Sequence, residues 1–348
     1  YGKTGWLSDL LPGFTLGVIL VPQAMAYGML AGVDPVYGLY AALVPLIIYT
    51  LFASTPHVSV GPTALASLLC LNGLSAFADP LTPEYLGLTI LLAALTGGLQ
   101  LLFGLLRLGG VTSLLSRPVL SGFVSAAALL IITSQLDALL GIPTERTTYL
   151  HENLTELLAH LRQLNPFSSL LGVGSLLTLL AAHRWLPAKF PTMLVLIVLT
   201  TALIWRSGQQ WGVATIGEVP AGLPQISVPQ VSWQLVTDLL PVALVLALIS
   251  FIETVSIGKA FSPQYPYYRV QPDRELLALG LSKIVGSFFQ AIPSSASFSR
   301  SAVIESSGGR GPLSNIFAAA LLVLVLLFLT PFFYHLPIPV LAAIIIFS

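Results

Sequence analysis

The stretch that decides the fold is Thr55-Pro-His-Val-Ser-Val-Gly-Pro-Thr-Ala-Leu-Ala-Ser-Leu-Leu, residues 55–69. It begins as a short extended piece and then predicts a helix that opens at Gly61-Pro62, where proline suits the first turn. A complete membrane span needs about 20 mainly apolar residues. This helix is too short for that and too polar at its start, so we expect it to begin part-way across a bilayer.

A second stretch repeats this plan: Ala291-Ile-Pro-Ser-Ser-Ala-Ser-Phe-Ser-Arg-Ser-Ala-Val, residues 291–303. Its serines can cap a helix start. Taken singly, a Gly-Pro pair can be a simple kink, and serines can bond back to their own helix. Together, two half-helices whose N-termini point at one midplane position form the binding-site pattern of inverted-repeat transporters. The free N–H groups and positive dipole ends of such starts suit an anion.

The composition excludes a soluble globular domain. Of 348 residues, 55% are hydrophobic and only 8% are charged, whereas soluble domains carry about 25% charged residues. The net charge is zero, so we expect no nucleic-acid partner, because such proteins carry a basic surface. Lone Cys70 has neither a disulfide partner nor metal-ligand spacing, and no His-x-x-x-His or Gly-x-Ser-x-Gly motif indicates an enzyme. The sequence predicts an all-α polytopic membrane protein.

Twelve apolar segments are expected along the chain. They are 13–31, 36–53, 61–76, 85–105, 118–140, 169–183, 190–206, 237–257, 275–290, 297–306, 313–331 and 337–348. If the N-terminus lies in the cytoplasm, most lysines and arginines fall at the cytoplasmic ends of the segments, as the positive-inside rule requires. We therefore expect a multi-pass protein of the inner membrane with a cytoplasmic N-terminus. Outer connection 141–168 is expected to hold a short surface helix. Inner stretch 261–275, with Tyr265, Tyr267 and Tyr268, is expected to be an interfacial loop.

Arg300 lies in an otherwise apolar setting within the second half-helix. An arginine at membrane depth is costly and is by default a functional residue, which favours a charged substrate over a neutral one. The structural alternative is a cation tied to backbone carbonyls or to Glu305.

Glu253 lies late in a long apolar run, so its carboxyl must be protonated, paired or bound to a cation. Taking up a proton on one side and releasing it on the other would couple transport to protons. A salt bridge to Arg300 or Lys283 is the structural alternative. Ile257, one turn on, offers no oxygen ligand, so proton coupling is favoured over sodium, although Thr254 and Ser256 keep sodium open.

Five motifs in order carry a family resemblance. They are Val21-Pro-Gln-Ala-Met-Ala-Tyr, Val60-Gly-Pro-Thr-Ala, Glu253-Thr-Val-Ser-Ile-Gly-Lys-Ala-Phe, Arg274-Glu-Leu-Leu-Ala-Leu-Gly and Ser297-Phe-Ser-Arg-Ser-Ala-Val. The sequence resembles the sulfate permease (SulP) family, which includes the mammalian solute carrier anion exchangers and prestin.

The resemblance implies a 7+7 inverted-repeat, UraA- and prestin-like fold. Residues 1–206 would be the first repeat and 237–348 an incomplete second one. Helices 1 to 4 and 8 to 11 would form a core domain, and helices 5 to 7 and 12 to 14 a gate domain. Since 337–348 ends within an apolar run, we expect a chain truncated in helix 12, without the C-terminal STAS domain that usually follows.

The resemblance also implies an anion pocket, whose expected residues are Gln23, Tyr27, Thr63, Ser297, Ser299 and Arg300. Family members often have phenylalanine where this chain has Thr63, so a wider pocket with an added donor is expected. Gln23 has a structural alternative as a helix-to-helix hydrogen bond. Tyr27 lies on the same helix face, four residues on.

The expected function is secondary active transport of a small anion: sulfate, bicarbonate, chloride or a small dicarboxylate such as fumarate. We expect proton-coupled symport by an elevator-type movement of the core past the gate, in a homodimer, with no cofactor or metal. An uncoupled exchanger or an anion channel on the same scaffold remains the alternative.

Overall fold

The computed structural model describes residues 5–113, 117–143, 150–186, 192–207, 210–229, 232–265 and 269–347. It divides into two compact units. Unit 1 comprises Tyr1–Ser116 and Gly222–Leu327, and unit 2 comprises Arg117–Ala221 and Phe328–Ser348. These are the helix sets expected for a core and a gate. Tyr267 and Tyr268 of the expected interfacial loop lie outside the described residues.

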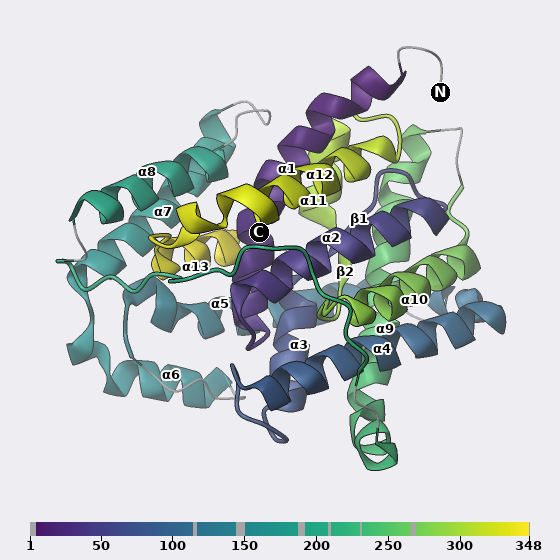
Figure 1. The fold of residues 1–348 in the computed structure, drawn as a ribbon, viewed down its shortest axis with the longest axis horizontal. Helices are drawn as coiled ribbons and strands as arrows, with labels where there is room; N and C mark the ends of the chain where they lie inside the picture. Colours follow the sequence, from purple (N-terminus) through teal and green to yellow (C-terminus); the bar gives the residue numbers. More distant parts are fainter. Residues whose placement is uncertain are drawn as a thin grey trace. The chain divides into compact units, whose positions relative to one another are not determined.

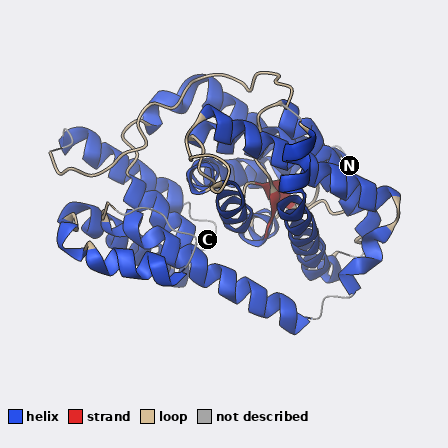
Figure 2. Ribbon diagram, turned by 90° about the horizontal axis from the view of Figure 1, so that it is seen from below, coloured by secondary structure: helices blue, strands red, loops and turns tan. Residues whose placement is uncertain are grey.

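Unit 1 contains the strand pair and most of the long helices (Figures 1 and 2). Its elements are α1 (Gly5–Leu30), α2 (Pro35–Phe52), β1 (Ser59–Gly61), α3 (Ala64–Leu74), α4 (Pro83–Leu105), α9 (Trp233–Phe261), α10 (Pro272–Phe288), β2 (Ser295–Ser297), α11 (Phe298–Ser306) and α12 (Leu313–Leu324), with 3-10 turns at Leu108–Ser113 and Ser262–Gln264. In Figure 2 the strands, drawn in red, lie among these helices.

Local sequence signals start several of these helices. Thr82 caps α4 by accepting a hydrogen bond from the Tyr85 N–H at 3.2 Å, and Pro83 follows in the first turn, where it lacks only an N–H that no helix carbonyl would accept. Ser232 caps α9 in the same way through the Leu235 N–H. Such caps fix where each apolar run enters its helix.

Unit 2 is smaller. Its elements are α5 (Arg117–Leu140), α6 (Leu150–Ala159), α7 (Pro166–Trp185), α8 (Thr192–Ser207) and α13 (Ile338–Phe347), with 3-10 turns at Leu161–Gln163 and Thr330–Phe333. α13 packs against α5 and α7, where Leu139, Ala342 and Ala343 form a buried cluster. The short helix expected within 141–168 is α6.

Six helices among the described residues are long and apolar enough to cross a membrane. They are Trp6–Leu30, Pro35–Phe52, Pro83–Leu105, Pro166–Trp185, Trp233–Phe261 and Leu313–Phe333. The sequence predicted a single segment over 313–331, but the structure does not form one regular helix there. α12 ends at Leu324 and passes into a π-helical turn at Val325–Leu329. A 3-10 turn, Thr330–Phe333, follows, with Pro331 in its first turn, where the missing N–H breaks no helix hydrogen bond.

A close contact between α1 and α2 in unit 1 gives a stability prediction. A Cβ atom built on Gly38 of α2 would overlap the Ala24 carbonyl oxygen of α1. Gly38→Ala is therefore expected to cost about 1–3 kcal/mol, as overpacking does, and to lower the thermal unfolding midpoint in detergent. Gly87→Ala in α4 is the matched control, since nothing lies within 4 Å of its Cβ position. Equal midpoints for the two variants would contradict this packing.

Candidate functional site

The two half-helices begin at a single strand pair in unit 1. β1 and β2 pair antiparallel, with Ser59 opposite Ser297 and Gly61 opposite Ser295. Each strand leads directly into a half-helix, β1 into α3 and β2 into α11. The antiparallel pairing makes these helices leave from opposite ends of the pair. The sequence prediction that both stretches are extended pieces followed by short helices is confirmed.

One detail of the first half-helix was predicted wrongly. The helix does not open at Gly61-Pro62 but at Ala64, with Thr63 as its N-cap. Gly61 is paired in the strand, so its backbone is extended and cannot begin a helix. The Thr63 hydroxyl accepts a hydrogen bond from the Ala66 N–H at 3.4 Å, which satisfies one donor of the helix start.

The second half-helix has an equivalent cap. The Ser297 hydroxyl accepts a hydrogen bond from the Arg300 N–H at 3.4 Å, as the serine-rich sequence predicted. Ser299 is half-buried, and its hydroxyl lies 3.2 Å from that of Ser297. Both half-helices thus present a capped, positive N-terminus and a hydroxyl group.

Arg300 links the two half-helix starts. The side chain is completely buried, and its Nη1 donates to the Pro62 carbonyl oxygen at 2.8 Å. The same guanidinium lies against Gly61, whose Cβ position is 3.5 Å from Nη2. Its Nε and Nη2 atoms are buried and have no hydrogen-bond partner. The alternative role for Arg300, a cation held by backbone carbonyls, therefore explains only Nη1. The other two guanidinium nitrogens, Nε and Nη2, can still donate to a bound ligand.

Gln23 adds further unpaired donors. It lies in α1, which packs against both α3 and α11, and it is 1% exposed. Neither its amide nitrogen nor its amide oxygen has a hydrogen-bond partner among the described residues. The alternative role for Gln23, a hydrogen bond to another helix, is therefore not observed. Tyr27, four residues on, is buried and lies within electrostatic range of Arg300.

Buried polar groups in folded proteins almost always have hydrogen-bond partners, so the exceptions indicate function. Several of these exceptions lie in the half-helix stretches: Arg300 in α11, Ser59 in β1, Ser67 in α3 and Ser294 next to β2. Gln23 lies in α1, which packs against both half-helices. Arginine, amide and hydroxyl groups all donate hydrogen bonds, and arginine accepts none. A set with more donors than acceptors suits an anion.

Glu253 lies beside this set. It is a half-buried residue of α9, and its Oε2 accepts a hydrogen bond from the Ser295 hydroxyl at 2.5 Å. The salt bridge to Arg300 or Lys283 that the sequence left open is not formed: in the described part of the chain, no Glu253 oxygen lies within 4.0 Å of a nitrogen of either side chain. The Thr254 hydroxyl donates to the Ser250 carbonyl.

Two buried networks were not found from the sequence. Lys283 Nζ donates to Gln100 Oε1 at 2.9 Å, deep between α10 and α4. Glu275, at the start of α10, accepts hydrogen bonds from the Tyr49 hydroxyl and the Ser54 N–H. The one sequence feature that could have indicated the first network is that Lys283 and Gln100 each lie within an apolar run. His, Cys, Asp and Glu residues that the structure describes form no group able to hold a metal ion.

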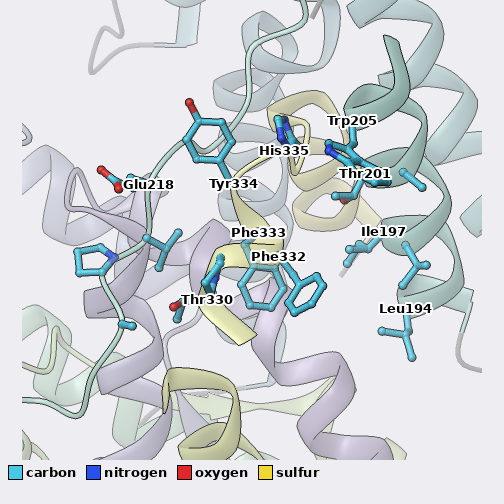
Figure 3. Close-up of a pocket in the computed structure, with 16 residues that line it drawn as sticks. Leu194, Ile197, Thr201, Trp205, Glu218, Thr330, Phe332, Phe333, Tyr334 and His335 are labelled. Atoms are coloured by element: carbon cyan, nitrogen blue, oxygen red, sulfur yellow. The ribbon is translucent and has the colours of Figure 1, made fainter. Parts of the chain in front are cut away.

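Unit 2 has a cavity of about 1170 Å³ between α8 and the segment that follows Phe328. Figure 3 shows Leu194 and Ile197 of α8 on one side and Phe332 and Phe333 on the other. Its lining is mainly apolar and includes Glu218 but no lysine or arginine. None of the predicted site residues lies there, so the donor set in unit 1 is the better candidate for an anion.

Several known proteins are similar to this chain in sequence and in fold. The chain is 36% identical to sulfate transporter 4.1, chloroplastic, of Arabidopsis thaliana, over 97% of this chain and 50% of that protein. It superimposes on the murine solute carrier 26 family member A9 anion transporter with a TM-score of 0.91 and 26% identity, covering 99% of this chain and 60% of that one. For the transmembrane domain of a cyanobacterial bicarbonate transporter, BicA, the values are 0.88 and 25%, covering 99% and 88%.

The chain spans about half the length of the curated relative above. These relatives are transporters rather than enzymes, and their shared fold identifies a multi-pass integral membrane protein. The family model described as "sulfate permease family" matches residues 6–348. This chain therefore belongs to the sulfate permease family.

Proposed function

We propose that the full-length protein is a secondary active transporter of small anions, carrying sulfate, bicarbonate, chloride or a small dicarboxylate such as fumarate. One observation carries the proposal. Arg300 is fully buried between two half-helix starts with its Nε and Nη2 unpaired. A buried cation without an anionic partner is costly, and a bound anion would supply the missing charge and acceptors.

The proposed pocket contains the residues expected from the sequence. Arg300 binds the anion by charge, and Gln23, Tyr27, Ser297 and Ser299 shape its surroundings. Thr63 contributes through the N-terminus that it caps. Without a bound anion, these buried donors have no acceptor, which costs free energy, and most of all for a charged group. A neutral molecule of the same size would not balance the charge of Arg300, so the site favours anions.

Glu253 is proposed as the coupling residue, with a proton favoured over sodium. It lies within electrostatic range of Arg300, so its charge acts on the same anion. A proton bound at Glu253 removes a negative charge from the site and thereby strengthens anion binding. This reciprocal effect is what couples two ligands thermodynamically.

The proposed movement is of the elevator type, in which unit 1 carries the anion past unit 2 as a rigid body. Every residue of the proposed pocket lies in unit 1, so the pocket can move without being taken apart. Residues 1–206 and 237–348 are proposed as the two inverted repeats, because α3 and α11 occupy the same place in each. We also propose location in the inner membrane and assembly as a homodimer.

The test is uptake of labelled sulfate, bicarbonate, fumarate and chloride into liposomes that contain the full-length protein, with labelled uracil as the neutral control. Saturable uptake of an anion, accumulation under an inward proton gradient and counterflow are expected. Single-channel currents or gradient-independent exchange would replace the symport proposal with a channel or an exchanger. Uptake of uracil alone would overturn the anion site.

A further inference from the structure

The sequence motif Arg274-Glu-Leu-Leu-Ala-Leu-Gly has no part in the anion pocket described above. Its arginine, in the first turn of α10, lines another pocket of unit 1, with a volume of about 380 Å³. Arg269 lines the same pocket, and the opposite wall is formed by the end of α2 and the turn that follows it. A volume of this size is typical of sites for small molecules.

The lining of this pocket is polar and carries charge of one sign. Its polar side chains are Thr50, Ser54, Thr55, Gln271 and the two arginines. No acidic residue lines it among those that the structure describes. Within that part of the chain, neither arginine has a carboxylate oxygen within 4.0 Å. Because a cleft lined by charge of one sign concentrates counter-ions, this pocket favours an anion.

Two acidic side chains lie close to the pocket, but each binds elsewhere. Glu275 is completely buried, and its Oε1 accepts a hydrogen bond from the Ser54 N–H at 2.9 Å. The Oδ1 of Asp273 accepts a hydrogen bond from the Gly109 N–H at 2.7 Å. Both carboxylates therefore have donors of their own, and the positive charge of the pocket is left without a partner from them.

Hydrogen bonds hold the two walls of the pocket together. The Ser54 hydroxyl accepts a hydrogen bond from the Gln271 N–H at 3.0 Å and donates one to Glu275. Arg274 Nε donates to the carbonyl oxygen of Phe52, the last residue of α2, at 2.8 Å. The alternative role for Arg274, a cap on the last carbonyls of a helix, explains only this nitrogen. Nη1 and Nη2 belong to an exposed side chain that this bond holds in place, and a guanidinium so oriented suits the oxygens of a phosphate group.

The pocket lies where a candidate membrane span ends. The span Pro35–Phe52 leads directly into the residues that line it. Leu51 and Phe52, in the last turn of that span, are 62% and 47% exposed, so apolar side chains stand beside a positively charged pocket. A phospholipid has the complementary pattern, a phosphate group next to apolar chains. In the orientation expected from the sequence, this end of α2 is cytoplasmic, and basic groups there attract anionic lipids.

We propose that this pocket binds a phosphate group, supplied by the headgroup of an anionic phospholipid. Arg269 and Arg274 bind the phosphate oxygens, and the side-chain amide of Gln271, which makes no helix-capping hydrogen bond, adds a donor. The acyl chains pass along Leu51 and Phe52. Free inorganic phosphate has the same chemistry without the chains, so these two apolar side chains favour the lipid. The site shares no residue with the proposed transport pocket and does not depend on which anion is carried.

The experiment counts the lipids bound to the full-length protein in detergent by native mass spectrometry, during titration with phosphatidylglycerol or with zwitterionic phosphatidylcholine. A basic residue near a membrane surface raises the affinity for anionic lipid by about fivefold. The double variant Arg269→Gln, Arg274→Gln is therefore expected to bind phosphatidylglycerol about 25-fold more weakly and phosphatidylcholine as the wild type does.

Two further variants separate a specific site from folding and from general charge. Arg269→Gln alone should lose about fivefold at the wild-type unfolding temperature, since Arg269 is exposed and has no hydrogen bond to another described residue. The double variant Arg107→Gln, Arg184→Gln is the matched control. Both of its arginines are exposed near helix ends but do not line the pocket, so its affinity for phosphatidylglycerol should be unchanged.

A second arm identifies the source of the phosphate group. An excess of inorganic phosphate is added to the lipid-bound wild type, with sodium chloride of equal ionic strength as the control for screening. Retention of phosphatidylglycerol is expected, and displacement by phosphate but not by chloride would overturn the lipid as the source. The site itself is overturned if the Arg269→Gln, Arg274→Gln variant binds phosphatidylglycerol like the wild type, if the control variant loses as much affinity, or if phosphatidylcholine binds the wild type equally well.

Discussion

Arg300→Met is expected to reduce anion uptake by about 100-fold or more while leaving the protein at least as stable as wild type. The loss corresponds to the 2–5 kcal/mol that follows when one partner of a buried, hydrogen-bonded charge pair is removed. The stability follows from burial. Arg300 makes one hydrogen bond, to Pro62, and has two unpaired nitrogens, and replacing buried ions with apolar groups is often neutral or stabilising.

Both quantities must be measured, because a structural arginine predicts a different pair of results. If Arg300 held the half-helices together, its removal would lower the unfolding temperature along with uptake. Arg300→Lys keeps the charge but loses the planar fork, so an intermediate loss of about tenfold is expected. Arg162→Met is the matched control, since Arg162 is exposed in unit 2. Uptake by Arg300→Met at the wild-type rate would exclude the site.

Glu253→Gln is expected to retain uptake but to lose its dependence on protons. A glutamine oxygen can still accept the hydrogen bond from Ser295, which now spans 2.5 Å to the carboxyl, so the local geometry should survive. The side chain can no longer gain or lose a proton. Accumulation under an inward gradient of one pH unit, about tenfold for one coupled proton, should fall to the equilibrium level.

The sign of the effect follows from the charge of the site. In the wild type, a low outer pH protonates Glu253 and strengthens anion loading, and a higher inner pH promotes release. Glutamine mimics the protonated state on both sides, so uptake should become insensitive to pH. Glu156→Gln is the control, because Glu156 is a half-exposed residue of α6 in unit 2, outside the proposed pocket. Proton-driven accumulation that persists in Glu253→Gln would place the coupling group elsewhere.

The half-helices could be predicted because their signals are local. A Gly-Pro pair and a serine cluster interrupt apolar runs, and lipid tolerates such interruptions only at a protected site. The exact start of α3 could not be predicted, since it depends on the pairing of Gly61 with Ser295 in a distant strand.

The buried networks could not be predicted for the same reason. Lys283 and Gln100 are separated by 183 residues, and Glu275 and Tyr49 by 226. The sequence shows a lysine and a glutamine in apolar runs but not that Gly97 and Gly280 let their helices meet. It also left Glu253 with a choice of ionic partners, and the structure provides the Ser295 hydroxyl instead. Partner choice inside a membrane protein is set by packing.

The most direct test of the account is to locate a heavy analogue of the transported anion in the full-length protein, using anomalous scattering from selenate if sulfate is carried or from bromide if chloride is carried. The account predicts one site in unit 1, within hydrogen-bond distance of the Arg300 guanidinium and beside Gln23, that disappears in Arg300→Met. An ordered anion elsewhere, with no occupancy at Arg300 in protein that transports, would contradict it.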